Sequence, residues 1–171
     1  MTPAFRVRGP LSGQGAACEA VLRALPDWFG IEESIREYVR DVEKLPTFVA
    51  EEVVGDAGGD AATVAAEAGG AVVGLLAVAS HSAVAAEIQV IGVLADRHRG
   101  GIGRALLAAA EGWLRERGVR YLTVKTLSST DPDPGYAGTR AFYEATGFVP
   151  LMELPTLWGA GNPCLVMLKT L

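Results

Sequence analysis

The sequence predicts a single α/β domain in which a mixed, mostly antiparallel sheet of about six to seven strands is flanked by about four helices. Two features predict this class: several strands follow one another over short links, and a strand–helix–strand unit comes after them. The chain has 171 residues, enough for one full core and short for two. Half of the residues are hydrophobic and a fifth are charged, which excludes a disordered chain. We therefore expect one domain over residues 1–171.

The first feature is the run of strands over short links. Residues 5–8, which come before this run and before two predicted helices, alternate between apolar and basic side chains, as a short strand does. Apolar segments follow at 48–54 and 70–80, and a connection rich in glycine and aspartate, 56–62, lies between them. Short links join antiparallel neighbours, so we expect a meander that leads into the next strand.

The second feature is the strand–helix–strand unit, which holds the parallel pair of the sheet. Residues 88–94 are apolar apart from Gln89, which is typical of a strand buried on both faces. From Ile102 apolar residues recur every three or four positions, the spacing of a helix with one buried face, and Gly118 favours its end. Because this helix separates the first strand from a second one at 119–127, the two strands should be parallel neighbours at the centre of the sheet.

Side-chain alternation along the strand at 88–94 predicts which residues share a face. Successive side chains of a strand point to opposite faces. We therefore expect Glu87, Gln89 and Ile91 on one face and Ile88 and Val90 on the other.

The remaining elements lie on either side of these strands. Apolar spacing predicts helices at 14–25 and 31–44, and the second of these has the clearest amphipathic pattern. Residues 128–138 contain two prolines and two glycines, so we expect an irregular loop there, followed by a late helix. A last strand at 164–169 closes the chain.

Composition excludes several classes of function. The net charge of −5 and the pI near 5.1 argue against a nucleic-acid or membrane partner. The first ten residues do not resemble a signal peptide, so we expect a cytoplasmic protein. Cys18 and Cys164 are too few for a metal site, and we expect both to be small core residues and no metal to be used.

A basic, glycine-rich turn lies between the strand at 88–94 and the helix that follows. The first turn of a helix has N–H groups without partners and the positive end of the dipole, which together favour an anion. Gly100, Gly101 and Gly103 would let a pyrophosphate approach the backbone, and Arg99 and Arg104 could bond to it. The alternative is a tight turn that uses glycine for its conformation alone.

This turn fits neither common nucleotide motif, but it resembles a third signature. It has no Gly-x-Gly-x-x-Gly for a dinucleotide and no Gly-Lys-Ser/Thr for a nucleoside triphosphate. The segment His98-Arg99-Gly100-Gly101-Ile102-Gly103 resembles the Arg/Gln-x-x-Gly-x-Gly/Ala signature of the GNAT superfamily of N-acetyltransferases, with His98 where Arg or Gln is usual. A second segment, residues 139–148, resembles the family's late helix through Tyr143, Gly147 and Phe148.

The resemblance extends roughly from Thr47 to the C-terminus and implies a GNAT-like single domain that uses acetyl-CoA as co-substrate. In this family the acetyl group passes directly to an amine in a ternary complex. The implied cofactor-binding residues are Ile91, Val93, Leu94, His98, Arg99, Gly100, Gly101, Ile102, Gly103, Arg104 and Tyr143.

The resemblance also implies two catalytic side chains. Tyr143 matches the tyrosine whose hydroxyl protonates the leaving sulfur, and its alternative role is that of a core tyrosine. Glu87 lies six residues before Val93, where some members place a glutamate base; its alternative role is that of a solvated side chain at a strand entrance. A backbone N–H near Val93 or Leu94 would polarise the carbonyl of the thioester.

The acceptor is left open by the sequence, although the resemblance places the first helices beside its pocket. Candidates for substrate contact are Trp28, Phe29, Tyr38, Glu87 and Gln89, and core packing is the alternative for the aromatic ones. The acceptor could be a small amine, an antibiotic, an amino acid, a peptide N-terminus or a protein lysine, and the acidic balance favours a cationic one. Also open are a homodimer and a non-catalytic acyl-CoA-binding sensor of the same fold.

Overall fold

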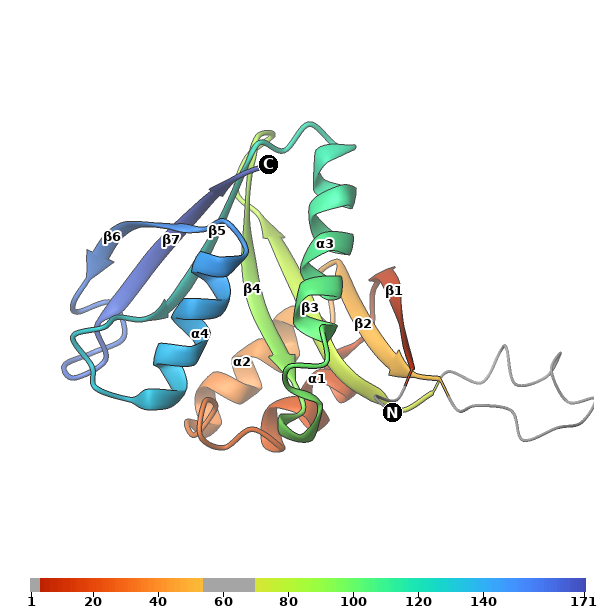
Figure 1. The fold of residues 1–171 in the computed structure, drawn as a ribbon, viewed down its shortest axis with the longest axis horizontal. Helices are drawn as coiled ribbons and strands as arrows, with labels where there is room; N and C mark the ends of the chain where they lie inside the picture. Colours follow the sequence, from red (N-terminus) through yellow and green to blue (C-terminus); the bar gives the residue numbers. More distant parts are fainter. Residues whose placement is uncertain (1–3, 54–69) are drawn as a thin grey trace, which may run out of the picture.

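The computed structural model describes residues 4–53 and 70–171, which form a seven-stranded sheet with helices on both faces (Figure 1). The predicted connection at 56–62 lies outside the described residues. The strands lie in the order β1-β2-β3-β4-β5-β7-β6. In chain order the elements are β1 (Phe5–Leu11), α1 (Gly15–Arg23), α2 (Glu32–Val42), β2 (Thr47–Glu52), β3 (Val72–Ser80), β4 (Ala85–Val93), a short 3₁₀ turn (Ala95–Arg97), α3 (Ile102–Arg115), β5 (Tyr121–Leu127), α4 (Pro134–Ala145), β6 (Val149–Leu154) and β7 (Cys164–Thr170).

The pairing of the strands confirms the predicted fold class. β1 to β4 form an antiparallel meander, and β5, β7 and β6 are also antiparallel neighbours. β4 and β5 are the parallel pair at the centre, connected by α3. This is the connection that a helical crossover between parallel strands requires.

Two cores form, one on each face of the sheet. On one face Leu106 and Leu114 of α3 pack with Leu76 of β3, and on the other Leu22 of α1 packs with Leu75. All five side chains are almost fully covered, and burial of each stabilises the fold by about 1.5–3 kcal/mol. The middle of the sheet is therefore buried on both faces, as its continuous apolar strands predict.

The helix α4 begins earlier than expected. It starts at Pro134, so the prediction of an irregular loop over all of 128–138 is wrong for its last five residues. The Asp133 side chain accepts hydrogen bonds from the N–H groups of Gly135 and Tyr136, at 2.8 and 3.1 Å, and so caps the helix. Proline fits the first helical position because no intrahelical N–H bond is lost there. One consequence is that Tyr136 lies on a helix.

A β-bulge in β4 changes which residues share a face. Ile88 and Val90 pair with consecutive residues of β3, so Gln89 between them has no partner. Ile88 and Ile91 both pack on the α3 side, whereas Val90 packs under α1 and α2. The prediction that Glu87, Gln89 and Ile91 share one face, opposite Ile88 and Val90, is therefore wrong, because the extra residue interrupts the alternation.

The two cysteines have the structural role expected of them. Cys18 and Cys164 are buried and form no disulfide. Burial raises the pKa of the Cys18 thiol to about 12, and the nearby charge of Glu19 acts in the same direction, so this thiol stays protonated at neutral pH. In the described part of the chain, no helix combines the length and the apolar character needed to cross a membrane.

Candidate active site

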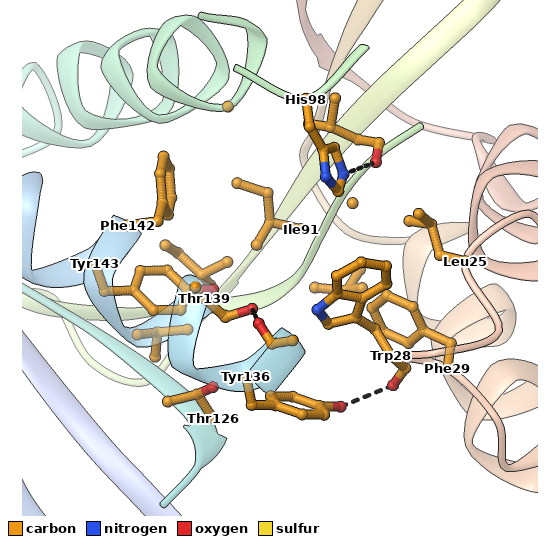
Figure 2. A pocket seen from close by; sticks show the side chains of 18 of the residues that line it. Leu25, Trp28, Phe29, Ile91, His98, Thr126, Tyr136, Thr139, Phe142 and Tyr143 are labelled. Carbon is orange, nitrogen blue, oxygen red and sulfur yellow. Dashed lines mark hydrogen bonds between the residues drawn. The ribbon is translucent and has the colours of Figure 1, made fainter. Parts of the chain in front are cut away.

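A cavity lies where the parallel strands β4 and β5 separate. Their paired residues run from Ala85 opposite Tyr121 to Ile88 opposite Val124, although both strands continue beyond this point. The opening holds a cavity of about 710 Å³, a size typical of small-molecule sites. Its walls come from both strands, the start of α3, α4 and the link between α1 and α2 (Figure 2). The cavity therefore reaches helices on both faces of the sheet.

The turn that precedes α3 is arranged to hold an anion. Gly101 has a left-handed backbone, with φ of 82°, and no side chain caps the helix. A Cβ atom built on Gly101 would meet no atom within 4 Å, so the space beside the first N–H groups is open. Arg99 and Arg104 line the same part of the cavity. Unpaired N–H groups, the helix dipole and two guanidinium groups together favour a phosphate.

Most of the predicted cofactor-binding residues meet at the cavity wall. These are Ile91, Val93, His98, Arg99, Gly101, Ile102, Gly103, Arg104 and Tyr143. Leu94 and Gly100 are not part of this wall. The Leu94 N–H donates to the Val73 carbonyl at 2.9 Å, and the Gly100 N–H donates to the Arg97 carbonyl at 3.3 Å. N–H groups alternate in direction along an antiparallel strand, so the Val93 N–H points away from β3. The Leu94 N–H is already bonded to β3, which leaves Val93 as the candidate to polarise the thioester carbonyl.

His98 ties the turn back to the end of β4. Its Nε2 lies 2.7 Å from the Val93 carbonyl oxygen, so this nitrogen carries the proton and donates it. The ring also meets Trp28 edge to face, with centroids 5.6 Å apart. Histidine can thus hold the turn at the position where arginine or glutamine is usual.

Gly103 allows α3 and α4 to approach closely. A Cβ atom at this position would lie 3.3 Å from the ring of Phe142 on α4, tighter than an ordinary contact. The glycine that the motif contains therefore has a packing role. It brings α4 up to the wall of the cavity.

Tyr143 projects from α4 into the cavity (Figure 2). Its ring packs between Phe142 and Phe148, with both centroid distances 5.4 Å. Burial raises the pKa of the hydroxyl well above that of ordinary tyrosine, and the neighbouring hydroxyls of Tyr38 and Tyr136 add to the shift. Tyr143 therefore keeps its proton through the neutral range, as a proton donor must.

Glu87 lies beside the cavity and not on its wall. Lys125 Nζ donates to the two carboxylate oxygens of Glu87 at 2.7 and 2.6 Å, and His81 Nε2 lies 3.2 Å from one of them. Lys125 does line the cavity, whereas His81 is exposed. Glu87 thus connects to the cavity through Lys125, and its role as a general base stays a prediction.

The comparisons identify the family. Residues 59–150, more than half of the chain, match the family model described as the acetyltransferase (GNAT) domain. The chain belongs to the GNAT acetyltransferase family. This confirms the resemblance that the two sequence motifs carry.

Solved GNAT structures share the fold along almost the whole chain. An acetyltransferase assigned to this family from Desulfovibrio desulfuricans has a TM-score of 0.72 and 21% identity, over 98% of this chain and 99% of that one. Ard1 from Thermoplasma volcanium has a TM-score of 0.71 and 20% identity over 98% of each chain. An aminoglycoside 6'-N-acetyltransferase complexed with coenzyme A has a TM-score of 0.65 and 18% identity over 96% of each. At these identities the similarity shows the fold alone. A search of curated proteins finds no match.

The predicted acceptor contacts also meet at this GNAT cavity, with the exception of Glu87. Trp28, Phe29, Tyr38 and Gln89 line it, and Gln89 Nε2 donates to Asp41 Oδ2 of α2 at 2.8 Å. The bulge explains this contact, because it leaves Gln89 directed towards α2.

The residues of the wall that the sequence interpretation missed include Lys125, Tyr136 and Trp158. For Lys125 the signal was a charged side chain in the middle of a predicted central strand, residues 119–127. Proline two residues before Tyr136 was the signal for the earlier start of α4. Trp158 lies on the link between β6 and β7, and nothing in its local sequence marks it as a site residue.

Proposed function

We propose that this GNAT protein transfers the acetyl group of acetyl-CoA directly to a primary amine, with both substrates bound at once. The observation that carries the proposal is a single cavity that joins the basic turn, Tyr143 and an aromatic wall near α2. Two substrates that enter such a cavity from opposite faces of the sheet can meet between β4 and β5, as catalysis by proximity requires. Membership of the GNAT family, and the coenzyme A complex of an aminoglycoside 6'-N-acetyltransferase of the same fold, support it.

The turn before α3 is the proposed site of the pyrophosphate of acetyl-CoA. The N–H groups of Gly101, Ile102 and Gly103 would donate to its oxygens, and Arg99 and Arg104 would neutralise its charge. The acyl arm would then follow the opening beside Ile91 and Val93. This path places the thioester next to Tyr143.

Tyr143 is the proposed proton donor to the leaving thiolate. As the C–N bond forms and the C–S bond breaks, the amine loses a proton and the sulfur needs one. The raised pKa of Tyr143 keeps its proton available until the thiolate develops. The Val93 N–H, which points away from β3, is the proposed donor to the carbonyl oxygen.

Glu87 is proposed to take up the proton of the amine through Lys125. Lys125 lines the cavity and donates to Glu87 at 2.6 Å. When Nζ passes one proton to the carboxylate, its free lone pair can accept the proton that the amine loses. His81 lies 3.2 Å from the same carboxylate and is exposed, which gives the proton a way out to solvent.

A second candidate function is a non-catalytic acyl-CoA-binding module. It is favoured by the absence of any carboxylate from the cavity wall, as far as the described residues are concerned. Release of coenzyme A thiol in the presence of amines separates the two functions, because only the enzyme releases it.

Replacement of Gly101 tests the pyrophosphate site. Gly101→Asp is expected to abolish acetyl-CoA binding in a folded protein, because it places an anion beside the helix start. Gly101→Asn is the matched control: it has nearly the same size, tolerates the left-handed backbone and carries no charge, so it should lose less affinity. Calorimetry measures both, and unchanged affinity of the Asp variant would contradict the site.

Removal of the Tyr143 hydroxyl tests the proton donor. Tyr143→Phe should lower turnover on the order of 10²–10⁴-fold, the range for general-acid catalysis, while acetyl-CoA affinity is retained because the ring still packs between Phe142 and Phe148. Tyr121→Phe, at an exposed position outside the cavity, is the control. Wild-type turnover of Tyr143→Phe, measured where chemistry limits the rate, would make Tyr143 a packing residue.

The pH dependence of Glu87→Gln tests the proton relay. An alkyl amine is mostly protonated below a pH of about 10, so loss of a base should slow the reaction strongly at neutral pH and progressively less as the pH rises. The measurement is kcat/KM from pH 6 to 10 for both proteins. An equal fractional loss at every pH would mean that Glu87 only holds Lys125 in place.

A further inference from the structure

Part of the cavity wall is aromatic. It is formed by Trp28, Phe29, Tyr38, Tyr136 and Trp158. These five side chains come from the link between α1 and α2, from α2, from α4 and from the link between β6 and β7. Four separate segments thus contribute aromatic rings to one small space.

Contacts between these segments hold much of the wall in place. The Tyr136 hydroxyl donates to the backbone carbonyl of Trp28 at 2.8 Å, as the dashed line in Figure 2 shows. Trp28 meets the edge of His98, and Phe29 meets Tyr38 edge to face with centroids 6.0 Å apart. A surface fixed in this way loses little side-chain entropy when a flat ligand packs on it.

The charged side chains of the cavity wall are all cationic within the described part of the chain: Arg97, Arg99, Arg104 and Lys125. Two carboxylates near the wall are bonded to other groups. Glu87 accepts from Lys125 and Asp41 accepts from Gln89. A ligand with several positive charges would therefore find no carboxylate to pair with on the described wall of the cavity.

We infer that the acceptor is a monoamine carried on a flat apolar body, of the arylalkylamine class, and is not a polycation. This inference rests on the proposed function and adds the substrate class. The aromatic body packs against Trp28 and its neighbours, and the amino group points towards Lys125 and the opening between β4 and β5. The sequence favoured a cationic acceptor because the net charge of the chain is −5. In the structure, the described wall of the cavity contains no acidic side chain, so this negative charge lies elsewhere.

A panel of amines tests the substrate class. At saturating acetyl-CoA, thiol release is measured with 2-phenylethylamine and tryptamine as flat monoamines, and with spermidine and kanamycin as polycations. The flat monoamines are expected to have at least tenfold higher kcat/KM. A higher kcat/KM for spermidine or kanamycin would overturn the inference and leave acetyl transfer in place.

A variant of the wall tests the assigned contact. Trp28→Leu should raise KM for 2-phenylethylamine roughly 3- to 10-fold, as the loss of an aromatic pair does, with folding checked by circular dichroism. Tyr121→Leu removes an aromatic ring outside the cavity and should leave KM unchanged. An unchanged KM in Trp28→Leu would contradict the aromatic contact.

A binding measurement separates failure of the inference from failure of the proposed function. Calorimetry of 2-phenylethylamine and spermidine is carried out on the wild-type protein saturated with coenzyme A. Tighter binding of 2-phenylethylamine supports the inference even if no amine is acetylated. The lack of acetylation would then overturn only the proposed transferase function. Tighter binding of spermidine overturns the inference whatever the turnover.

Discussion

The separation of β4 from β5 is the constraint on which the rest of the site depends. Parallel pairing stops at Ile88 and Val124, so beyond this point the facing edges of the two strands border an opening, while their other edges stay paired with β3 and β7. The bulge at Gln89 lies next to this point and bends β4. In Figure 1 the two strands diverge, and α3 and α4 cover the same face of the sheet. A ligand can thus reach backbone N–H groups at the centre of an otherwise closed sheet.

His98 links the two ends of the cavity. Its ring donates to the Val93 carbonyl at the end of β4 and packs against Trp28 of the aromatic wall. The anion-binding turn and the aromatic wall are therefore held by one side chain. Tyr136 adds a second link, from α4 to the backbone of Trp28.

Local features of the sequence were sufficient to predict the fold and the basic turn. Helical spacing from Ile102, the glycines before it and the central apolar strand each depend on neighbouring residues alone. The bulge at Gln89 could not be predicted, because it depends on the register between β3 and β4. The bond between Glu87 and Lys125 joins residues 38 positions apart, and its geometry depends on where β5 lies. Pro134 was interpreted as a breaker, although proline is also favoured at the first position of a helix.

A crystal structure of the protein with bound coenzyme A tests the central claim, that the opening between β4 and β5 is where acetyl transfer takes place. The pyrophosphate should lie on the N–H groups at the start of α3. The sulfur should lie in the opening, within about 3.5 Å of the Tyr143 hydroxyl, the reach of a proton donor to sulfur. A coenzyme A molecule bound elsewhere, or a sulfur far from Tyr143, would contradict this claim.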